Sequence, residues 1–221
     1  MESIRKQHGF TLVEIAIVLV IIGLLLGGIL KGQEMITQAK IKNVIADVTG
    51  VSAAMYGYQD RYRALPGDDN RADRWAGATK GNGNGVIEGA YNYTGAAPPE
   101  SLQFWDQLRR AGFVGGAGTE NPFNAVSGKM GVQTGDGSGA TPAGVLGTAA
   151  GTQLFAGLIL CSANLPDKIA ISVDSQMDDG VGTTGSVRAM KGGPNPTLAP
   201  NAAADPYTED GVSTYAICRQ M

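Results

Sequence analysis

Few residues in this chain of 221 could take part in catalysis. The chain has one histidine, His8, and two cysteines, Cys161 and Cys218. A Ser-His-Asp triad or a histidine general base would therefore depend on His8, and removal of the first nine residues would eliminate it. The same count excludes a zinc site built from four cysteine or histidine ligands. The sequence predicts no catalytic residue, and we expect that the protein is not an enzyme.

Carboxylate ligands for a metal ion are the next chemistry to consider. Asp174, Asp178 and Asp179 lie within six residues and precede a glycine turn. Such carboxylates suit a hard cation such as calcium, but they also suit the hydrogen bonds of a turn at a helix C-terminus. We expect no metal and no other cofactor, with calcium at these three aspartates as the alternative.

Two further motif matches lack the context that would make them binding sites. Residues 180–185 fit the pattern GxGxxG, but they follow a turn, without a strand before them or a helix after them. Residues 82–87 resemble the middle of an EF-hand loop. However, Lys80 and Tyr91 occupy the first and the bidentate ligand positions, so the loop cannot bind calcium as an EF-hand does.

The longest apolar segment covers residues 10–30, and its one charged residue is Glu14. As a helix with a rise of about 1.5 Å per residue it would span about 30 Å, the thickness of the hydrocarbon core of a bilayer. The apolar core of a secretory signal is usually shorter, and the A-x-A type of cleavage site is missing here. The segment is therefore either a membrane helix or the buried core of a helical assembly.

Glu14 is unusual in this segment, because a carboxylate in hydrocarbon costs about 2.5–3.5 kcal/mol on insertion scales. Its position near one membrane face lowers that cost. We expect Glu14 to have a partner or a function, with an interfacial glutamate of no particular role as the alternative.

The N-terminus resembles that of type IV pilin-like proteins, a family of pilins, minor pilins and the pseudopilins of type II secretion. The resemblance rests on a basic leader, Gly9, the residues Phe10-Thr11-Leu12-Val13-Glu14 and the apolar run. It implies that a membrane prepilin peptidase cleaves after Gly9 and that Phe10 becomes N-methylated. It also implies that Glu14 pairs with the Phe10 amino group of a neighbouring subunit.

The helical pattern continues beyond the apolar segment, since no proline interrupts residues 10–65. An apolar or neutral residue recurs every three or four positions, which predicts an amphipathic helix over residues 31–65 that packs on a head domain. These positions are Ile41, Val44, Ile45, Val48, Ser52, Met55, Gln59 and Tyr62. Pro66 ends the helix. A coiled coil is the alternative, but the stripe is too short for several heptads.

Residues 66–221 contain all ten prolines and most of the glycines, which indicates a separate globular head. The expected fold is α+β and pilin-like, with one long N-terminal helix, a Gly-rich head and a small antiparallel sheet. We predict a short helix over residues 100–111 and a helix rather than a strand over residues 164–177. Strands are predicted at residues 154–161, 186–190 and 214–219, and residues 115–151 are predicted to form a surface loop with at most a short hairpin.

Cys161 and Cys218 are an even pair in a head that should lie outside the cytoplasm, so we predict a disulfide. It would close a loop of about 57 residues and contribute about 3–4 kcal/mol to stability. Many pilins close their C-terminal region with a cysteine pair, so the resemblance supports this bond.

The sequence thus predicts a structural subunit of a type IV pilus-like filament. Residues 1–9 would be a cleaved leader, and residues 10–30 would be the transmembrane and filament-core helix. We expect a single-pass precursor in the bacterial inner membrane with its head in the periplasm. Its expected partners are copies of itself, other pilin-like subunits, the prepilin peptidase and methyltransferase, and an inner-membrane assembly platform.

Three other functions remain as alternatives. The first is a pseudopilin or minor pilin of a type II secretion system, and the second is a signal-anchored periplasmic binding domain. The third is a DNA-binding minor pilin, because a run of arginines begins at Arg61 beside Tyr62 and Trp75. Four acidic residues lie among those arginines, and the chain has a net charge of −3, so we do not expect nucleic acid as a partner. The interleaved acids are Asp60, Asp68, Asp69 and Asp73, of which Asp68 and Asp69 are expected in an exposed turn.

Overall fold

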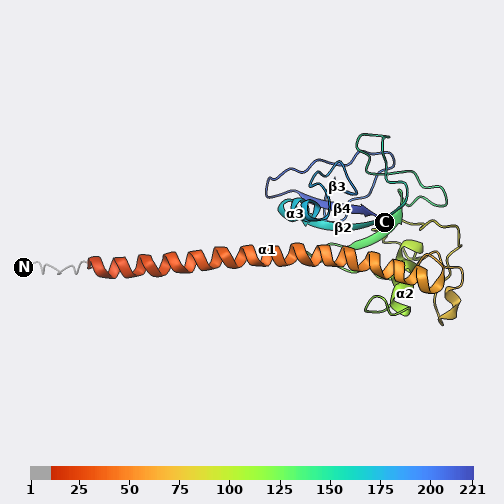
Figure 1. The fold of residues 1–221 in the computed structure, drawn as a ribbon, viewed down its shortest axis with the longest axis horizontal. Coiled ribbons are helices and arrows are strands. Elements are labelled where there is room, and N and C mark those ends of the chain that lie inside the picture. Colours follow the sequence, from red (N-terminus) through yellow and green to blue (C-terminus); the bar gives the residue numbers. More distant parts are fainter. Residues whose placement is uncertain (1–10) are drawn as a thin grey trace, which may run out of the picture. The chain divides into compact units, whose positions relative to one another are not determined.

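The computed structural model describes residues 11–221 and divides the chain into two compact units, Met1–Ala39 and Lys40–Met221. The predicted processing residues Gly9 and Phe10 lie outside the described residues. The elements of the described part are shown in Figure 1. In chain order they are α1 (Leu12–Tyr62), the 3-10 turn η1 (Ala72–Arg74), α2 (Glu100–Arg110), β1 (Met130–Thr134), β2 (Leu158–Pro166), α3 (Asp167–Met177), β3 (Val187–Lys191) and β4 (Thr214–Gln220).

Helix α1 ends close to where the sequence predicts. The prediction extends to residue 65, but the last helical residue is Tyr62. Arg63 follows with a φ of 53°, and its N–H donates to the carbonyl of Gln59 at 2.9 Å. A left-handed residue of this kind closes a helix C-terminus, and the proline three residues later prevents continuation.

The buried stripe of α1 in the second unit differs in part from the predicted one. The two share Ile41, Val44, Val48 and Met55, and the predicted Ile45 is only partly buried. Val51, Ala54 and Tyr58 are buried in place of Ser52 and Gln59. Either spacing is compatible with one helix face. Tyr58 is buried because its ring packs in the core while its hydroxyl donates to Asp69 at 2.7 Å.

The four strands form one antiparallel sheet with the order β1-β2-β4-β3. Strands β2, β3 and β4 and helices α2 and α3 confirm the predicted elements, with boundaries that shift by a few residues. The structure corrects the prediction for residues 115–151, because β1 lies inside that stretch. Its residues show no alternation of apolar and polar side chains, since all five are buried, and Gly131 packs directly against the backbone of Tyr91.

Side chains alternate between the two faces of the sheet, as the period of a strand requires. Leu160 of β2 joins the core with Val48 and Met55 of α1. Its neighbours Ile159 and Cys161 join the core of the opposite face, which the loops over residues 142–155 and 196–204 cover. The part of α1 in the second unit therefore packs on one face of the sheet, and loops cover the other (Figure 1).

Cys161 and Cys218 form the predicted disulfide. They lie directly opposite each other on β2 and β4, with their Cα atoms 4.0 Å apart, and they are separated by 57 residues in the sequence. The bond therefore ties the C-terminal strand to the centre of the sheet.

We expect the Cys161→Ala/Cys218→Ala variant to lose about 3–4 kcal/mol of unfolding free energy, because the unfolded chain regains the freedom of a long loop. Urea unfolding of wild type and variant would measure this as a lower midpoint. An unchanged midpoint would show that the disulfide does not stabilise the head. The wild type in a reducing buffer is the matched control and should show the same shift.

Candidate functional site: the start of the apolar helix

The first turn of α1 contains a capping box made by Thr11 and Glu14. The backbone N–H and the Oγ1 hydroxyl of Thr11 both donate to Oε2 of Glu14, each at 2.7 Å. In return, Oγ1 of Thr11 accepts from the backbone N–H of Glu14 at 3.3 Å. The two side chains thereby satisfy N–H groups that a helix start leaves without partners.

This local role of Glu14 was missed in the sequence analysis, although the pattern T-x-x-E before an apolar run is a known signal for it. Because Thr11 donates two hydrogen bonds to the Glu14 carboxylate, the cost of placing this charge in an apolar helix is lower than expected from the sequence. Within the described residues, both hydrogen bonds of Glu14 reach Oε2, so Oε1 is available to a second partner. A negative charge in the first turn is also favourable because the N-terminal end of a helix carries a partial positive charge.

The helix that follows Glu14 is apolar on every side. Each large apolar side chain from Leu12 to Leu30 is at least 46% exposed. No residue in the most apolar window of the helix is buried, and this stretch is long and apolar enough to cross a membrane. A helix without a polar face is stable only when lipid or other helices cover it. Nothing within the described residues of the first unit provides that cover.

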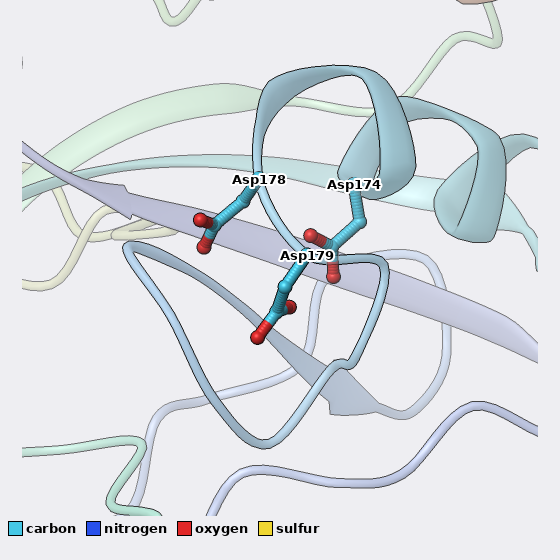
Figure 2. Close-up of side chains that lie close together, drawn as sticks. All are labelled: Asp174, Asp178 and Asp179. Atoms are coloured by element: carbon cyan, nitrogen blue, oxygen red, sulfur yellow. The ribbon is translucent and has the colours of Figure 1, made fainter.

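The three aspartates at the end of α3 do come together (Figure 2). One carboxylate oxygen from each of Asp174, Asp178 and Asp179 lies within 4.8 Å of the others. Asp174 is fully buried, and its burial raises the pKa of its carboxyl group above the usual range, although Tyr207 and the N–H of Gly180 donate to it. The charges of the two neighbouring aspartates raise that pKa further.

Each of these carboxylates also accepts hydrogen bonds from the loop that follows α3. Asp178 accepts from the backbone N–H groups of Ser186 and Val187. Asp179 accepts from the N–H of Val181 at 2.9 Å and from the hydroxyl of Thr184 at 2.6 Å, and these bonds lower its pKa. The three residues are the set that could hold a hard cation, but within the described residues each of their carboxylate oxygens except Oδ1 of Asp178 already accepts a hydrogen bond.

The structure contradicts the predicted exposure of two acidic residues that follow α1, Asp68 and Asp69. Asp68 is 4% exposed, and its carboxylate accepts from the N–H groups of Gly83, Asn84 and Gly85. Asp69 is fully buried, and the guanidinium of Arg74 donates to it at 2.8 Å. Burial acts to raise the pKa of Asp69, but its hydrogen bonds outweigh burial and lower it. The sequence reveals neither contact, because Asp68 is bound by the later loop over residues 83–85 and the contact of Asp69 depends on the three-dimensional fold of the turn that contains Arg74.

Comparison with known proteins identifies the N-terminal segment. Residues 4–30 match the family description of the prokaryotic N-terminal methylation motif, which is characteristic of type IV pilin-like proteins. The matched residues include Gly9, Phe10, Thr11 and Glu14. The chain carries this motif on an α+β pilin-like fold with a long N-terminal helix, an antiparallel sheet and a C-terminal disulfide. No significantly similar chain was found among curated proteins or solved structures.

We expect 1 mM calcium to change the thermal midpoint of the head by less than about 1 °C relative to EGTA, because binding stabilises a protein only when the ligand exceeds its dissociation constant. Differential scanning fluorimetry of the full chain in detergent would measure this. A rise of several degrees that disappears in the Asp179→Asn variant would contradict the expectation and assign calcium to the three aspartates. A Glu209→Gln variant would control for the loss of an exposed acidic charge.

Proposed function

We propose that the protein is a structural subunit of a type IV pilus-like filament, and that it acts by assembly rather than by catalysis. A prepilin peptidase cleaves the chain after Gly9, the new terminus at Phe10 is N-methylated, and the mature chain polymerises through α1. The observation that carries this proposal is the apolar segment of α1 up to Leu30, whose large side chains are exposed all round and whose one charge is Glu14.

The position of that charge supports assembly in a fixed register. A carboxylate buried in an apolar environment needs a partner, and so does a buried ammonium group. Cleavage before Phe10 creates such an ammonium group four residues from Glu14. Pairing between the Glu14 carboxylate of one subunit and the Phe10 ammonium of the next satisfies both charges in one arrangement of the two helices.

The capping box gives Glu14 a partner before assembly. Thr11 holds Oε2 of the carboxylate within the same chain, so the isolated subunit does not leave the group unsatisfied. A neighbour's ammonium can then add to Oε1 without breaking these bonds. Docking therefore gains an ion pair and keeps the helix start intact.

The apolar surface of α1 must be buried both in the membrane-bound precursor and in the assembled filament, and the groups that bury it differ. In the precursor, lipid covers the helix and the chain spans the inner membrane once, with its head in the periplasm. In the filament, the helices of neighbouring copies cover one another, and an assembly platform in the inner membrane transfers the subunit between the two environments. The disulfide between Cys161 and Cys218 suits an oxidising compartment such as the periplasm.

A pseudopilin or minor pilin of a type II secretion system is the second candidate, because the methylation motif is equally characteristic of these subunits. The abundance of the protein in sheared surface filaments distinguishes a main filament subunit from a minor pilin or a pseudopilin. A main filament subunit dominates the protein sheared from the cell surface, whereas a minor subunit or a pseudopilin does not.

We expect the Glu14→Gln variant to be cleaved normally but to assemble more than a hundredfold less. Removing one member of a buried ion pair costs about 3–5 kcal/mol, since the other charge stays buried without a partner. Immunoblots of sheared filaments and of membranes, from a host with the prepilin peptidase and assembly platform, would measure assembly and processing separately.

The matched control is Glu34→Gln, which removes an exposed glutamate that pairs with Lys31 on the same helix at 2.8 Å. This variant should assemble like the wild type. If Glu14→Gln formed filaments at the wild-type level, Glu14 would have no role in assembly.

A further inference from the structure

Two chemically labile sequences follow each other in the loop after η1. The chain contains two Asn-Gly pairs, Asn82-Gly83 and Asn84-Gly85, and both asparagines are exposed to solvent. In a flexible chain an asparagine loses its side-chain amide most readily when glycine follows, because glycine has no side chain to hinder the attack of its own backbone nitrogen. We call residues 81–85 the Asn-Gly loop. From the sequence alone, its asparagines are the first in the chain expected to deamidate.

Deamidation at such a pair proceeds in two steps and needs only water as a reactant. In the first step the glycine nitrogen gives up its proton and attacks Cγ of the asparagine. A C–N bond forms, the bond between Cγ and Nδ2 breaks, and the amide group leaves as ammonia with that proton. In the second step water opens the cyclic imide at either carbonyl and produces aspartate or isoaspartate. The first step therefore requires a glycine N–H that is free to lose its proton.

In this structure one carboxylate holds both attacking nitrogens. The N–H of Gly83 donates to Oδ1 of Asp68 at 2.6 Å, and the N–H of Gly85 donates to Oδ2 at 2.7 Å. The N–H of Gly83 also lies 3.1 Å from the backbone carbonyl oxygen of Asp68, which accepts from it. Because Asp68 is buried, water competes little for these bonds. Each oxygen of the carboxylate thus engages the nitrogen of one labile pair.

A carboxylate acceptor opposes the first step in two ways. Loss of the glycine proton would place a negative nitrogen beside a negative oxygen, and little water is present to screen the repulsion. Hydrogen bonds to an ionised acceptor are also about twice as strong as bonds between neutral groups. They therefore keep the glycine nitrogen directed at Asp68 and restrict its rotation toward the asparagine side chain.

The two asparagine side chains are held as well. Oδ1 of Asn82 accepts from the N–H of Asn84 at 2.9 Å, and Oδ1 of Asn84 accepts from the N–H of Val86 at 2.8 Å. Their amide groups both donate to Oε1 of Glu88, at 3.0 and 3.1 Å. Each side chain is thereby fixed on the residue two positions later, as in an Asx turn. The nitrogen that would leave as ammonia is bound to Glu88.

The fold of the loop also explains why glycine follows each asparagine. Gly83 and Gly85 have φ angles of 76° and 85°, in the left-handed region that favours glycine. A Cβ atom at Gly83 would in addition lie 2.9 Å from the side-chain amide of Asn70. Other residues are strained at these positions, so the labile pairs are a consequence of the way the loop wraps around Asp68.

We propose that Asn82 and Asn84 are latent deamidation sites and that Asp68 keeps both of them in the amide form. Conversion to isoaspartate would lengthen the backbone by one atom and add a negative charge near the carboxylates of Asp68 and Glu88. The loop would then lose the hydrogen bonds that close it around Asp68. The protection is a property of the folded head, so it holds whether or not the chain assembles into filaments.

The deamidation rate of the full chain in detergent at neutral pH tests this role. The Asp68→Asn variant has one acceptor oxygen in place of two, so at least one glycine N–H loses its acceptor. We expect deamidation of Asn82 or Asn84 to be at least about tenfold faster in the folded variant than in the folded wild type, the factor that corresponds to one hydrogen bond to a charged group. Peptide mass spectrometry with electron-transfer fragmentation would follow each site and separate aspartate from isoaspartate.

The matched control is Asp69→Asn, which removes the neighbouring buried carboxylate. That carboxylate accepts from Tyr58 and Arg74 and makes no contact with the glycines of the Asn-Gly loop through its side chain. This variant should deamidate at Asn82 and Asn84 like the wild type. Equal acceleration in both variants would assign the protection to general rigidity and overturn the role of Asp68. An unchanged or slower rate in Asp68→Asn would overturn it as well, and a slower rate would identify the carboxylate as a base that promotes the reaction.

Hydrogen exchange of the wild type keeps the test decisive if the Asp68→Asn variant does not fold. Base-catalysed exchange removes the same N–H proton that deamidation must remove, so a held proton slows both. We expect the amides of Gly83 and Gly85 to exchange at least about tenfold more slowly in the native chain than in the chain unfolded in urea. Exchange at the unfolded rate at either glycine would overturn the proposed protection.

Discussion

The structure depends on a helix that has no polar face and therefore cannot remain exposed to water. Helix α1 is apolar on every side up to Leu30, and the one charge of this segment, Glu14, lies in the first turn. Burying such a helix is strongly favourable, but burial is not directional and fixes no register. In the proposed assembly, pairing of the Glu14 carboxylate with the terminal ammonium group of a neighbouring copy fixes the register. This combination supports the proposed assembly through the helix.

The part of α1 from Ile41 onward differs from the apolar segment, because it buries one face and leaves the other exposed to water. Ile41, Val44 and Val48 pack against the sheet and α3, and the opposite face stays exposed. The disulfide and the ion pair between the buried Asp69 and the partly exposed Arg74 stabilise the fold of the head around this stripe. The core of the head thus includes the α1 residues from Ile41 onward, whereas the apolar segment up to Leu30 contacts no other part of the described chain.

The sequence predicted the features with a strong local signal. The length and termination of α1, the helices at α2 and α3, three strands and the cysteine pair follow from periodicity, proline and composition. Strand β1 was missed because its residues are buried on both faces and include Gly131, so they show no period. The burial of Asp69 could not be predicted, because it depends on how the turn after α1 places Arg74 and Tyr58 around its carboxylate. The burial of Arg188 could not be predicted either, because its partners lie in a distant loop. The capping box of Thr11 and Glu14 is predictable from the pattern T-x-x-E before an apolar run.

The most direct test of this account is the intact mass of the protein from membranes of hosts with and without the prepilin peptidase. The account predicts a chain that begins at methylated Phe10 in the first host and a chain that retains residues 1–9 in the second. A chain that still begins at Met1 in the presence of the peptidase would contradict assembly through a processed N-terminus. The protein would then be a membrane-anchored head with another function.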